Sequence, residues 1–139
     1  MKLEICRATP SLPLPLVISE VAAGFPSPAD GYMGDALDLN QLLISHPAAT
    51  FFVRVSGESM IDANIHPGDV LVVDRSLQPK HKDIVIAVLN GEFTVKRVLC
   101  KSKRIFLAPE NPSFSLIEVG KEEEFQVWGV VTYVIHKAK

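Results

Sequence analysis

The sequence predicts a mainly β fold: a compact antiparallel β domain with one short helix, preceded by an extended N-terminal arm. Three observations support this prediction. From residue 51 onward, short runs rich in valine, isoleucine and phenylalanine alternate with turn residues. Asn90-Gly91 is a strong hairpin signal, because both central residues of a type I′ turn need positive φ. Only one short stretch carries helix signals, which is typical of a small antiparallel β domain.

The first 37 residues are expected to form the arm, and residues 38–139 the β domain. The arm holds five of the ten prolines and shows no sustained period of 2 or 3.6. Proline fixes φ, removes a backbone donor and biases its predecessor towards extended conformations. Residues 12–18 are too apolar for a purely solvated tail. The arm is therefore predicted to lie along a sheet.

The same segment superficially resembles a secretory signal, with Lys2 and Arg7 ahead of LPLPLVI and small residues at 21–24. Pro13 and Pro15 interrupt its apolar core, and Glu20 precedes the small residues, so this alternative is disfavoured. No run approaches ~18 uninterrupted apolar residues, and no transmembrane helix is expected.

The helix is predicted at Asp38–Ser45, capped by Asp38 and ended by His46-Pro47. Six strands are predicted: Phe51–Val55, Val70–Asp74, Ile84–Leu89, Glu92–Cys100, Arg104–Ala108 and Phe125–His136.

Composition narrows the class of protein. A chain of 139 residues, 47% hydrophobic and 22% charged, fits one globular domain plus an extension. The net charge of -2 argues against a broad nucleic-acid surface, so direct sequence-specific DNA binding is not expected. Cys6 and Cys100 lack motif spacing, which favours reduced thiols in a cytoplasmic protein. The four histidines lack the spacing of a zinc site, and neither a metal nor a cofactor is expected.

The most specific chemical pattern is FFVRVSGESM at Phe51–Met60. A strand-forming run breaks at Gly57, and Ser59 follows two residues later, which places a hydroxyl just past the end of a strand. Serine is a weak nucleophile and needs a nearby base. The surrounding residues depart from the G-x-S-x-G elbow at its last position. A histidine triad on another fold stays open, but the sequence favours none of the four histidines.

Lys96 is the other candidate base. Alternation along Glu92–Cys100 puts Thr94, Lys96 and Val98 on one face of a strand. Among such neighbours desolvation would disfavour the ammonium and lower the lysine pKa, whereas Arg97 would stay charged. The pattern alone favours the simpler alternative of a solvent-facing lysine on an edge strand.

Three segments, which follow one another along the chain, favour Lys96 as a base over a solvent-facing lysine. They are VSGESM, PGDVLVVD at 67–74 and DIVIAVLNGEFTVKRV at 83–98. Together they resemble the self-cleaving Ser–Lys peptidase domain of LexA-type repressors and UmuD-type mutagenesis proteins, over about residues 21–135. The resemblance implies a fold of LexA/signal-peptidase type, with Ser59 as nucleophile and Lys96 as general base. AAGFPSP resembles the bond that such proteins cut in themselves, which implies cleavage between Ala23 and Gly24.

Only 23 residues precede that bond, and they lack a helix-turn-helix pattern, so the resemblance is to the UmuD type. It implies a homodimer, cleavage stimulated by a RecA–single-stranded-DNA filament, and no membrane association. The shortened product would serve a UmuC-like Y-family polymerase in error-prone translesion synthesis during the SOS response. Two departures are visible: the first twenty residues match little, and Lys82 stands where relatives often have glycine.

Two other functions stay open. One is a β-domain interaction module in which Ser59 and Lys96 are inert. The other is a signal-peptidase-like enzyme acting on other proteins, which the missing membrane anchor disfavours. Cis and trans cleavage also both stay open, because the 35 residues from Gly24 to Ser59 could span about 120 Å when extended.

Overall fold

Strands dominate the computed structural model, which describes residues 5–6, 13–17 and 33–138. Within these residues one α-helix, α1 (Leu39–Leu43), and two 3-10 turns, Pro47–Ala49 and Ile61–Ala63, accompany the strands. The strands are β1 (Ile5–Cys6), β2 (Pro13–Val17), β3 (Met33–Asp38), β4 (Thr50–Arg54), β5 (Val70–Asp74), β6 (Ile84–Leu89), β7 (Glu92–Lys101), β8 (Arg104–Ala108), β9 (Ile117–Glu118) and β10 (Phe125–Ile135).

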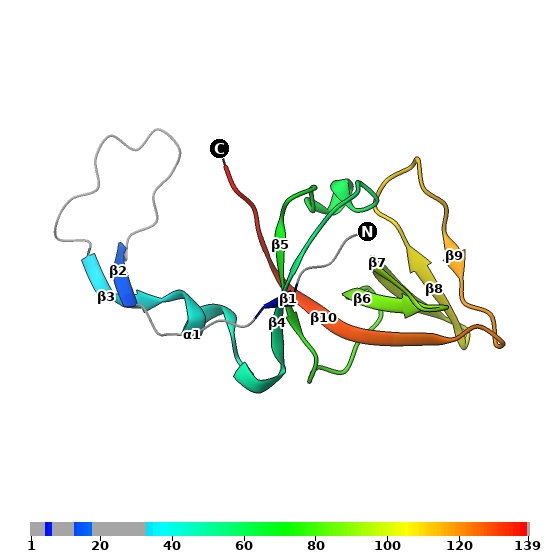
Figure 1. Cartoon of the computed structure of the whole chain (residues 1–139), viewed down its shortest axis with the longest axis horizontal. Helices are drawn as coiled ribbons and strands as arrows, with labels where there is room; N and C mark the ends of the chain where they lie inside the picture. The colour runs from blue at the N-terminus through cyan, green and yellow to red at the C-terminus, as the bar shows by residue number, and fades with distance from the viewer. Residues whose placement is uncertain (1–4, 7–12, 18–32, 139) are drawn as a thin grey trace.

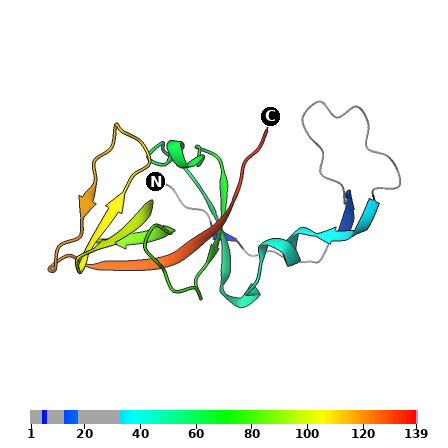
Figure 2. The same cartoon turned by 180° about the vertical axis from the view of Figure 1, so that it is seen from behind.

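Eight strands form one antiparallel sheet in the order β1-β4-β5-β10-β6-β7-β8-β9, and β2 and β3 form a separate ribbon. The long strand β10 joins the two halves of the sheet, as Figures 1 and 2 show. Its first part pairs with β6 and its last part with β5. Register shifts at Val127/Gly129 and Val131/Tyr133 interrupt these pairings. Such bulges bend a strand and increase its twist, which lets β10 pass from one half to the other.

The bent sheet buries two apolar clusters. One contains Val53, Met60, Ile65, Leu71, Val73, Ile86 and Val95 together with Val55, and the other contains Val85, Ala87, Val98, Leu107 and Val130. Neighbouring residues of β6 therefore belong to different clusters, as the alternation of a strand requires when both of its faces are covered. Gly129 permits close packing of β10 on β5, because a Cβ there would lie 2.5 Å from Cγ1 of Val73.

The predicted fold class is confirmed: the structure is mainly antiparallel β with one short helix. β5, β6 and β8 have the predicted bounds, and β4, β7 and β10 differ from theirs by one residue. The helix is shorter than predicted, and its N-cap Asp38 accepts a 3.0 Å hydrogen bond from the Asn40 amide. The prediction omitted β1, β2, β3 and β9. The boundary after residue 37 stays a prediction.

Several turns between strands depend on positive φ, and two of them bear on the predictions. Asn90 (φ 50°) and Gly91 (φ 82°) form the predicted hairpin turn. Lys82 also has positive φ, 77°, a conformation that glycine adopts with less strain. The Lys82 amide donates to the Val98 carbonyl at 2.8 Å, and its carbonyl accepts from Arg97 Nη1 at 2.6 Å. The chain therefore makes this turn with lysine in place of glycine.

No helix among the described residues is long and apolar enough to cross a membrane.

Candidate active site

The end of β4 leads directly to the serine. Val55 extends the pairing with two backbone hydrogen bonds, from its amide to the Asp69 carbonyl at 2.9 Å and from the Gly68 amide to its carbonyl at 2.8 Å. Gly57 then turns the chain with φ of 90°, and no atom outside its neighbours lies within 4 Å of its Cβ position. Met60 follows Ser59 and is 1% exposed in the core. The strand and this buried side chain fix the two ends of the serine loop.

The residues after β8 brace the same loop. The Ser59 carbonyl accepts from the Glu110 amide at 2.8 Å, and the Asp62 amide donates to the Glu110 carbonyl at 2.8 Å. Asn111 Nδ2 donates to the Glu58 carbonyl, also at 2.8 Å. These three hydrogen bonds hold the backbone on both sides of the serine.

Lys96 approaches the serine from the middle of β7. Its Nζ donates to Ser59 Oγ at 2.9 Å, to Thr94 Oγ1 at 2.7 Å and to the Val95 carbonyl at 3.1 Å. Lys96 and Ser59 are each 8% exposed. The structure therefore brings together the two residues that the sequence singled out, and it excludes most solvent from their contact.

Burial lowers the pKa of Lys96 below its ordinary value, because desolvation penalises the ammonium form. Within the described part of the chain, no carboxylate forms an ion pair with Lys96 to offset this effect. The three N–H groups of the ammonium match the three oxygens around Nζ. After deprotonation the amine can keep two of these bonds and present its lone pair to the Ser59 hydroxyl. Such an amine can act as a base at a lower pH than an ordinary lysine can.

An ion pair links the serine loop to the lysine strand. Arg97 Nε donates to Glu110 Oε1 at 2.6 Å, and Glu110 is the residue whose backbone bonds to Ser59. Arg97 follows Lys96 directly along β7. The Arg97–Glu110 pair thus helps to set the position of the loop relative to β7.

A pocket of about 350 Å³ opens beside Lys96. Its lining includes the polar Thr94 and Lys96 and the apolar Leu89, Phe114 and Ile117. Phe114 is 47% exposed, so its ring is available to contact a ligand. An extended peptide placed across the Ser59 hydroxyl could insert an apolar side chain into this pocket.

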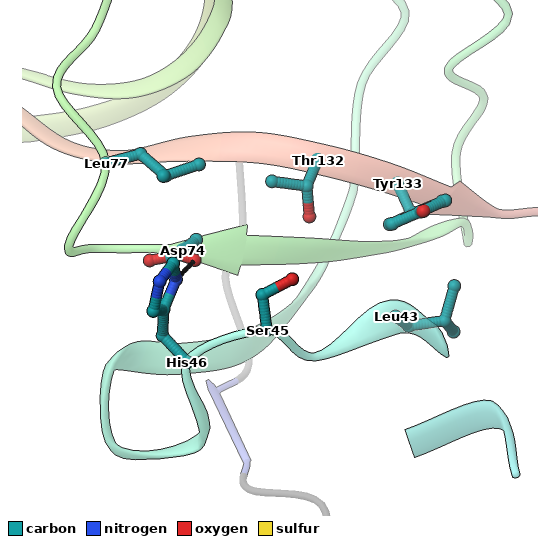
Figure 3. Close-up of a pocket in the computed structure, with 7 residues that line it drawn as sticks. All are labelled: Leu43, Ser45, His46, Asp74, Leu77, Thr132 and Tyr133. Atoms are coloured by element: carbon teal, nitrogen blue, oxygen red, sulfur yellow. Dashed lines mark hydrogen bonds and ion pairs between the residues drawn. The ribbon is translucent and has the colours of Figure 1, made fainter. Parts of the chain in front are cut away.

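A second pocket, of about 340 Å³, contains a histidine but no matching nucleophile (Figure 3). His46 Nδ1 lies 2.6 Å from Asp74 Oδ2, whereas the Ser45 hydroxyl does not point towards the His46 ring. Burial raises the pKa of Asp74, but hydrogen bonds from Ser76 and His46 outweigh it and hold the pKa below its ordinary value.

The other three histidines also contact groups other than a serine hydroxyl. His136 pairs with Asp69 at 2.7 Å, and the His136 ring lies 5.4 Å from the His66 ring. His81 Nδ1 accepts from the Cys100 amide at 2.9 Å. In the described part of the chain no histidine is hydrogen-bonded to a serine hydroxyl, so the structure offers no support for a histidine triad.

No metal site stands out: across residues 5–6, 13–17 and 33–138, no group of three or more His, Cys, Asp or Glu side chains is arranged to hold an ion. The predicted cleavage residues Ala23 and Gly24 lie outside the described residues.

The sequence placed Thr94 on the same face of the strand as Lys96 but gave it no role in the site. Two further residues that shape the site, Glu110 and Asn111, were not predicted, and no local pattern marks them. They follow a strand far along the chain, and only the folded sheet brings their segment to Ser59.

Comparison with known proteins places this chain in a family. The Peptidase S24-like family matches residues 15–132, which is most of the chain. The chain belongs to the Peptidase S24-like family. Protein MucA from Salmonella typhimurium is 48% identical over 121 residues, covering 86% of this chain and 82% of MucA. Protein ImpA from Shigella flexneri is 50% identical over 127 residues, covering 90% of this chain and 85% of ImpA.

A LexA repressor from Acidithiobacillus ferrooxidans is less similar to the chain. It is 40% identical over 132 residues, covering 93% of this chain but only 63% of the repressor. The predicted membership of the LexA/UmuD peptidase family is therefore confirmed. The chain also matches MucA and ImpA over more of their length than it matches the repressor.

Proposed function

We propose that this S24-like protein is a serine endopeptidase that cuts its own Ala23-Gly24 bond, with Ser59 as nucleophile and Lys96 as general base. The observation that carries the proposal is the 2.9 Å hydrogen bond from Lys96 Nζ to Ser59 Oγ between two buried side chains. A buried lysine without a paired carboxylate is destabilising, and such groups cluster at functional sites.

The proposed reaction begins with neutral Lys96. The amine takes the proton from Ser59 Oγ as that oxygen attacks the Ala23 carbonyl carbon. Backbone amides around Ser59 stabilise the oxyanion, and those of Glu58 and Ser59 donate to no other described residue. The Lys96 ammonium then protonates the Gly24 nitrogen as the C–N bond breaks. Lys96 then takes a proton from a water molecule that attacks the Ala23 carbonyl carbon, and it returns that proton to Ser59 Oγ as the ester bond breaks.

We also propose a biological role for the shortened product: accessory subunit, as a homodimer, of an error-prone Y-family polymerase in the SOS response. In this proposal a RecA–single-stranded-DNA filament stimulates the cut in the cytoplasm. The support is the ordered match of motifs to UmuD-type proteins and the similarity to MucA and ImpA over most of their length.

Incubation of the purified full-length chain near pH 10, followed by mass analysis of the fragments, tests the chemistry. We expect one cut, between Ala23 and Gly24, that Ser59→Ala and Lys96→Ala both abolish. Lys101→Ala and Ser113→Ala are matched controls at exposed positions and should cut at the rate of the unchanged chain. Cleavage that persists in Lys96→Ala would contradict the assignment of the base.

Further arms of the experiment separate the alternatives. A chain that stays uncut under every condition would favour the inert interaction module. Cleavage of unrelated substrates without self-cleavage would favour the signal-peptidase-like enzyme. Mixing the Ser59→Ala chain with a mass-tagged active chain tests trans cleavage. Addition of a RecA filament at neutral pH should accelerate the cut. A lack of acceleration would contradict the proposed role in the SOS response but not the proposed peptidase activity.

A further inference from the structure

Arg97 connects three segments of the main sheet through one side chain. It lies on β7, opposite Ile84 of β6 on one side and Ala108 of β8 on the other. Its Nη1 donates to the Lys82 carbonyl at 2.6 Å, and its Nε donates to Glu110 Oε1 at 2.6 Å. The guanidinium therefore binds the turn before β6 and the segment after β8 at the same time. Lysine carries its charge on a single nitrogen and lacks this rigid fork of donors.

Glu110 connects the ion pair to the nucleophile. Its amide donates to the Ser59 carbonyl at 2.8 Å, and its carbonyl accepts from the Asp62 amide at 2.8 Å. The next residue, Asn111, donates from Nδ2 to the Glu58 carbonyl at 2.8 Å. Figures 1 and 2 both show the chain after β8 reaching the green loop between β4 and β5. Glu110 and Asn111 are called the brace below.

We propose that Arg97 is a positioning residue for self-cleavage: by holding the brace on β7, it keeps Ser59 Oγ within hydrogen-bond distance of Lys96 Nζ. This inference rests on the proposed function, in which Ser59 is the nucleophile and Lys96 the base. Lys96 and Arg97 are neighbours on β7, so a brace attached to Arg97 is also fixed relative to the base. Arg97 does not touch the reacting atoms and acts through the backbone of Glu110.

The contact that depends on the brace is sensitive to displacement. Lys96 Nζ and Ser59 Oγ are 2.9 Å apart, and a misplacement of about 1 Å can slow an enzyme about a hundredfold. Val55 and the buried Met60 anchor the two ends of the serine loop. Between these anchors, the brace bonds directly to the carbonyls of Glu58 and Ser59. Loosening the brace should therefore lower the rate while the strand and the core stay intact.

The Arg97–Glu110 pair is suited to holding the brace, and a second ion pair provides a control. Both side chains are partly buried, so solvent screens their attraction less than that of a fully exposed pair. The hydrogen bond to the Lys82 carbonyl further restricts the guanidinium. Arg104 and Glu118 form a pair of the same 2.6 Å length that is more exposed. Arg104 begins β8, at the end of that strand away from Glu110.

Self-cleavage of the full-length chain near pH 10 measures the effect of the pair. Arg97→Met keeps a long side chain but removes both donors, and we expect it to slow the cut by about tenfold or more. Arg104→Met is the matched control and should cut at the rate of the unchanged chain. An Arg97→Met chain that cuts as fast as the unchanged chain would overturn the proposal.

A double-mutant cycle tests whether Arg97 acts through Glu110. Glu110→Met should also slow the cut, because it removes the acceptor on the brace. If the two side chains act as one pair, the double variant should be at most about twofold slower than the slower single variant. Losses that multiply would show that Arg97 acts by another route, and the proposal would fail.

Hydrogen exchange separates positioning from a general loss of stability. In the Ser59→Ala background the chain stays intact, and the Glu110 amide reports the bond from the brace to the serine loop. We expect this amide to exchange about fivefold faster or more when Arg97→Met is added. The Val55 amide, which bonds to Asp69 before the same loop, should be unchanged. Equal acceleration of both amides would indicate general destabilisation and contradict the positioning role.

A small fluorophosphonate probe measures the reactivity of Ser59 without requiring the arm to bind. Ser59 Oγ forms a bond to phosphorus, Lys96 takes the hydroxyl proton, and fluoride leaves. At a temperature where thermal unfolding shows every variant to be folded, labelling of Arg97→Met should slow by about the same factor as its self-cleavage. Normal labelling combined with slow self-cleavage would show that Arg97 acts on the arm, which would refute the proposal.

The same probe separates this inference from the proposed function. A chain whose Ser59 is labelled but that never cuts between Ala23 and Gly24 would refute the proposed function alone. Slower labelling in Arg97→Met would then still support the positioning role, and equal labelling of the two chains would overturn it.

Discussion

Lys96 and Ser59 lie 37 positions apart in the sequence, yet Nζ of the lysine donates to Oγ of the serine at 2.9 Å. Two independent parts of the fold create this contact. β7 carries the lysine in the sheet, and the turn after β4 carries the serine. Each residue is only 8% exposed, so the pair is both close and desolvated.

Replacement of Lys96 by methionine should stabilise the protein at neutral pH. Burial lowers the pKa of Lys96 in the folded state, so the unfolded chain binds more protons between the folded pKa and the ordinary value near 10.4. Wild-type stability therefore rises with pH across that window. We expect Lys96→Met to raise the free energy of unfolding by about 1 kcal/mol or more at pH 7, with the gain shrinking towards pH 10.

Chemical denaturation at several pH values measures this difference. Lys101→Met is the control, because Lys101 is exposed and its replacement should change nothing at any pH. A gain from Lys96→Met that is the same at pH 7 and pH 10 would show that the lysine carries no desolvation penalty.

Thr94 is predicted to be a positioning residue for the base. Its Oγ1 accepts a 2.7 Å hydrogen bond from Lys96 Nζ. Thr94→Val keeps the shape but removes the acceptor, so self-cleavage should slow by about tenfold. Loss of an acceptor also disfavours the ammonium, and the midpoint of the pH–rate profile should move to lower pH. Thr94→Ser should restore both properties. A slower rate with an unmoved midpoint would indicate a purely structural role.

Gly57→Ala should strain the backbone of a turn without creating a steric clash in the core. Gly57 has φ of 90°, but no atom is close enough to clash with an added Cβ. The backbone conformation alone should cost about 1–2 kcal/mol of stability. We expect cleavage to fall further than this loss explains, because the turn positions Ser59. At Gly129 an added Cβ would lie 2.5 Å from Val73. Gly129→Ala should therefore destabilise the fold more than Gly57→Ala does, and thermal unfolding of the two variants checks this order.

Asp74→Asn should weaken the fold in a pH-dependent way. Hydrogen bonds from Ser76 and His46 outweigh burial and lower the Asp74 pKa, so the carboxylate stabilises the folded state above the ordinary value of about 3.9. That stability is lost as pH falls through the folded pKa. We expect Asp74→Asn to lose about 1.5–3 kcal/mol at pH 7 and much less near pH 2.

Denaturant unfolding at the two pH values measures the Asp74 effect. Asp62→Asn at an exposed position is the control and should have little effect at either pH. An Asp74→Asn loss of equal size at both pH values would mean that the ionised carboxylate is not the stabilising species.

The main sheet was predictable from local patterns. Val70–Asp74 and Ile84–Leu89 are continuous strand-forming runs bounded by turn residues, and their bounds agree with the structure. The Asn90-Gly91 turn sets the register between β6 and β7. That register places Lys96 opposite Val85, inside the sheet, whereas the residue pattern by itself favoured an exposed edge lysine.

Other features depend on contacts that no local pattern encodes. β1 and β9 have two residues each and exist only because a neighbouring strand pairs with them. Glu110 braces Ser59 from a segment that the folded sheet brings close. The proline-containing strand β2 was expected only as an extended arm, since proline removes donors that strands normally use.

The pH–rate profile of self-cleavage, measured on the full-length chain with a Lys96→Ala control, tests the central claim most directly. If neutral Lys96 is the base, the rate should rise tenfold per pH unit and level off at a midpoint below the ordinary lysine value of about 10.4. The Lys96→Ala chain should show no cut between Ala23 and Gly24 at any pH. A profile that levels off at the same midpoint in both chains would contradict the account.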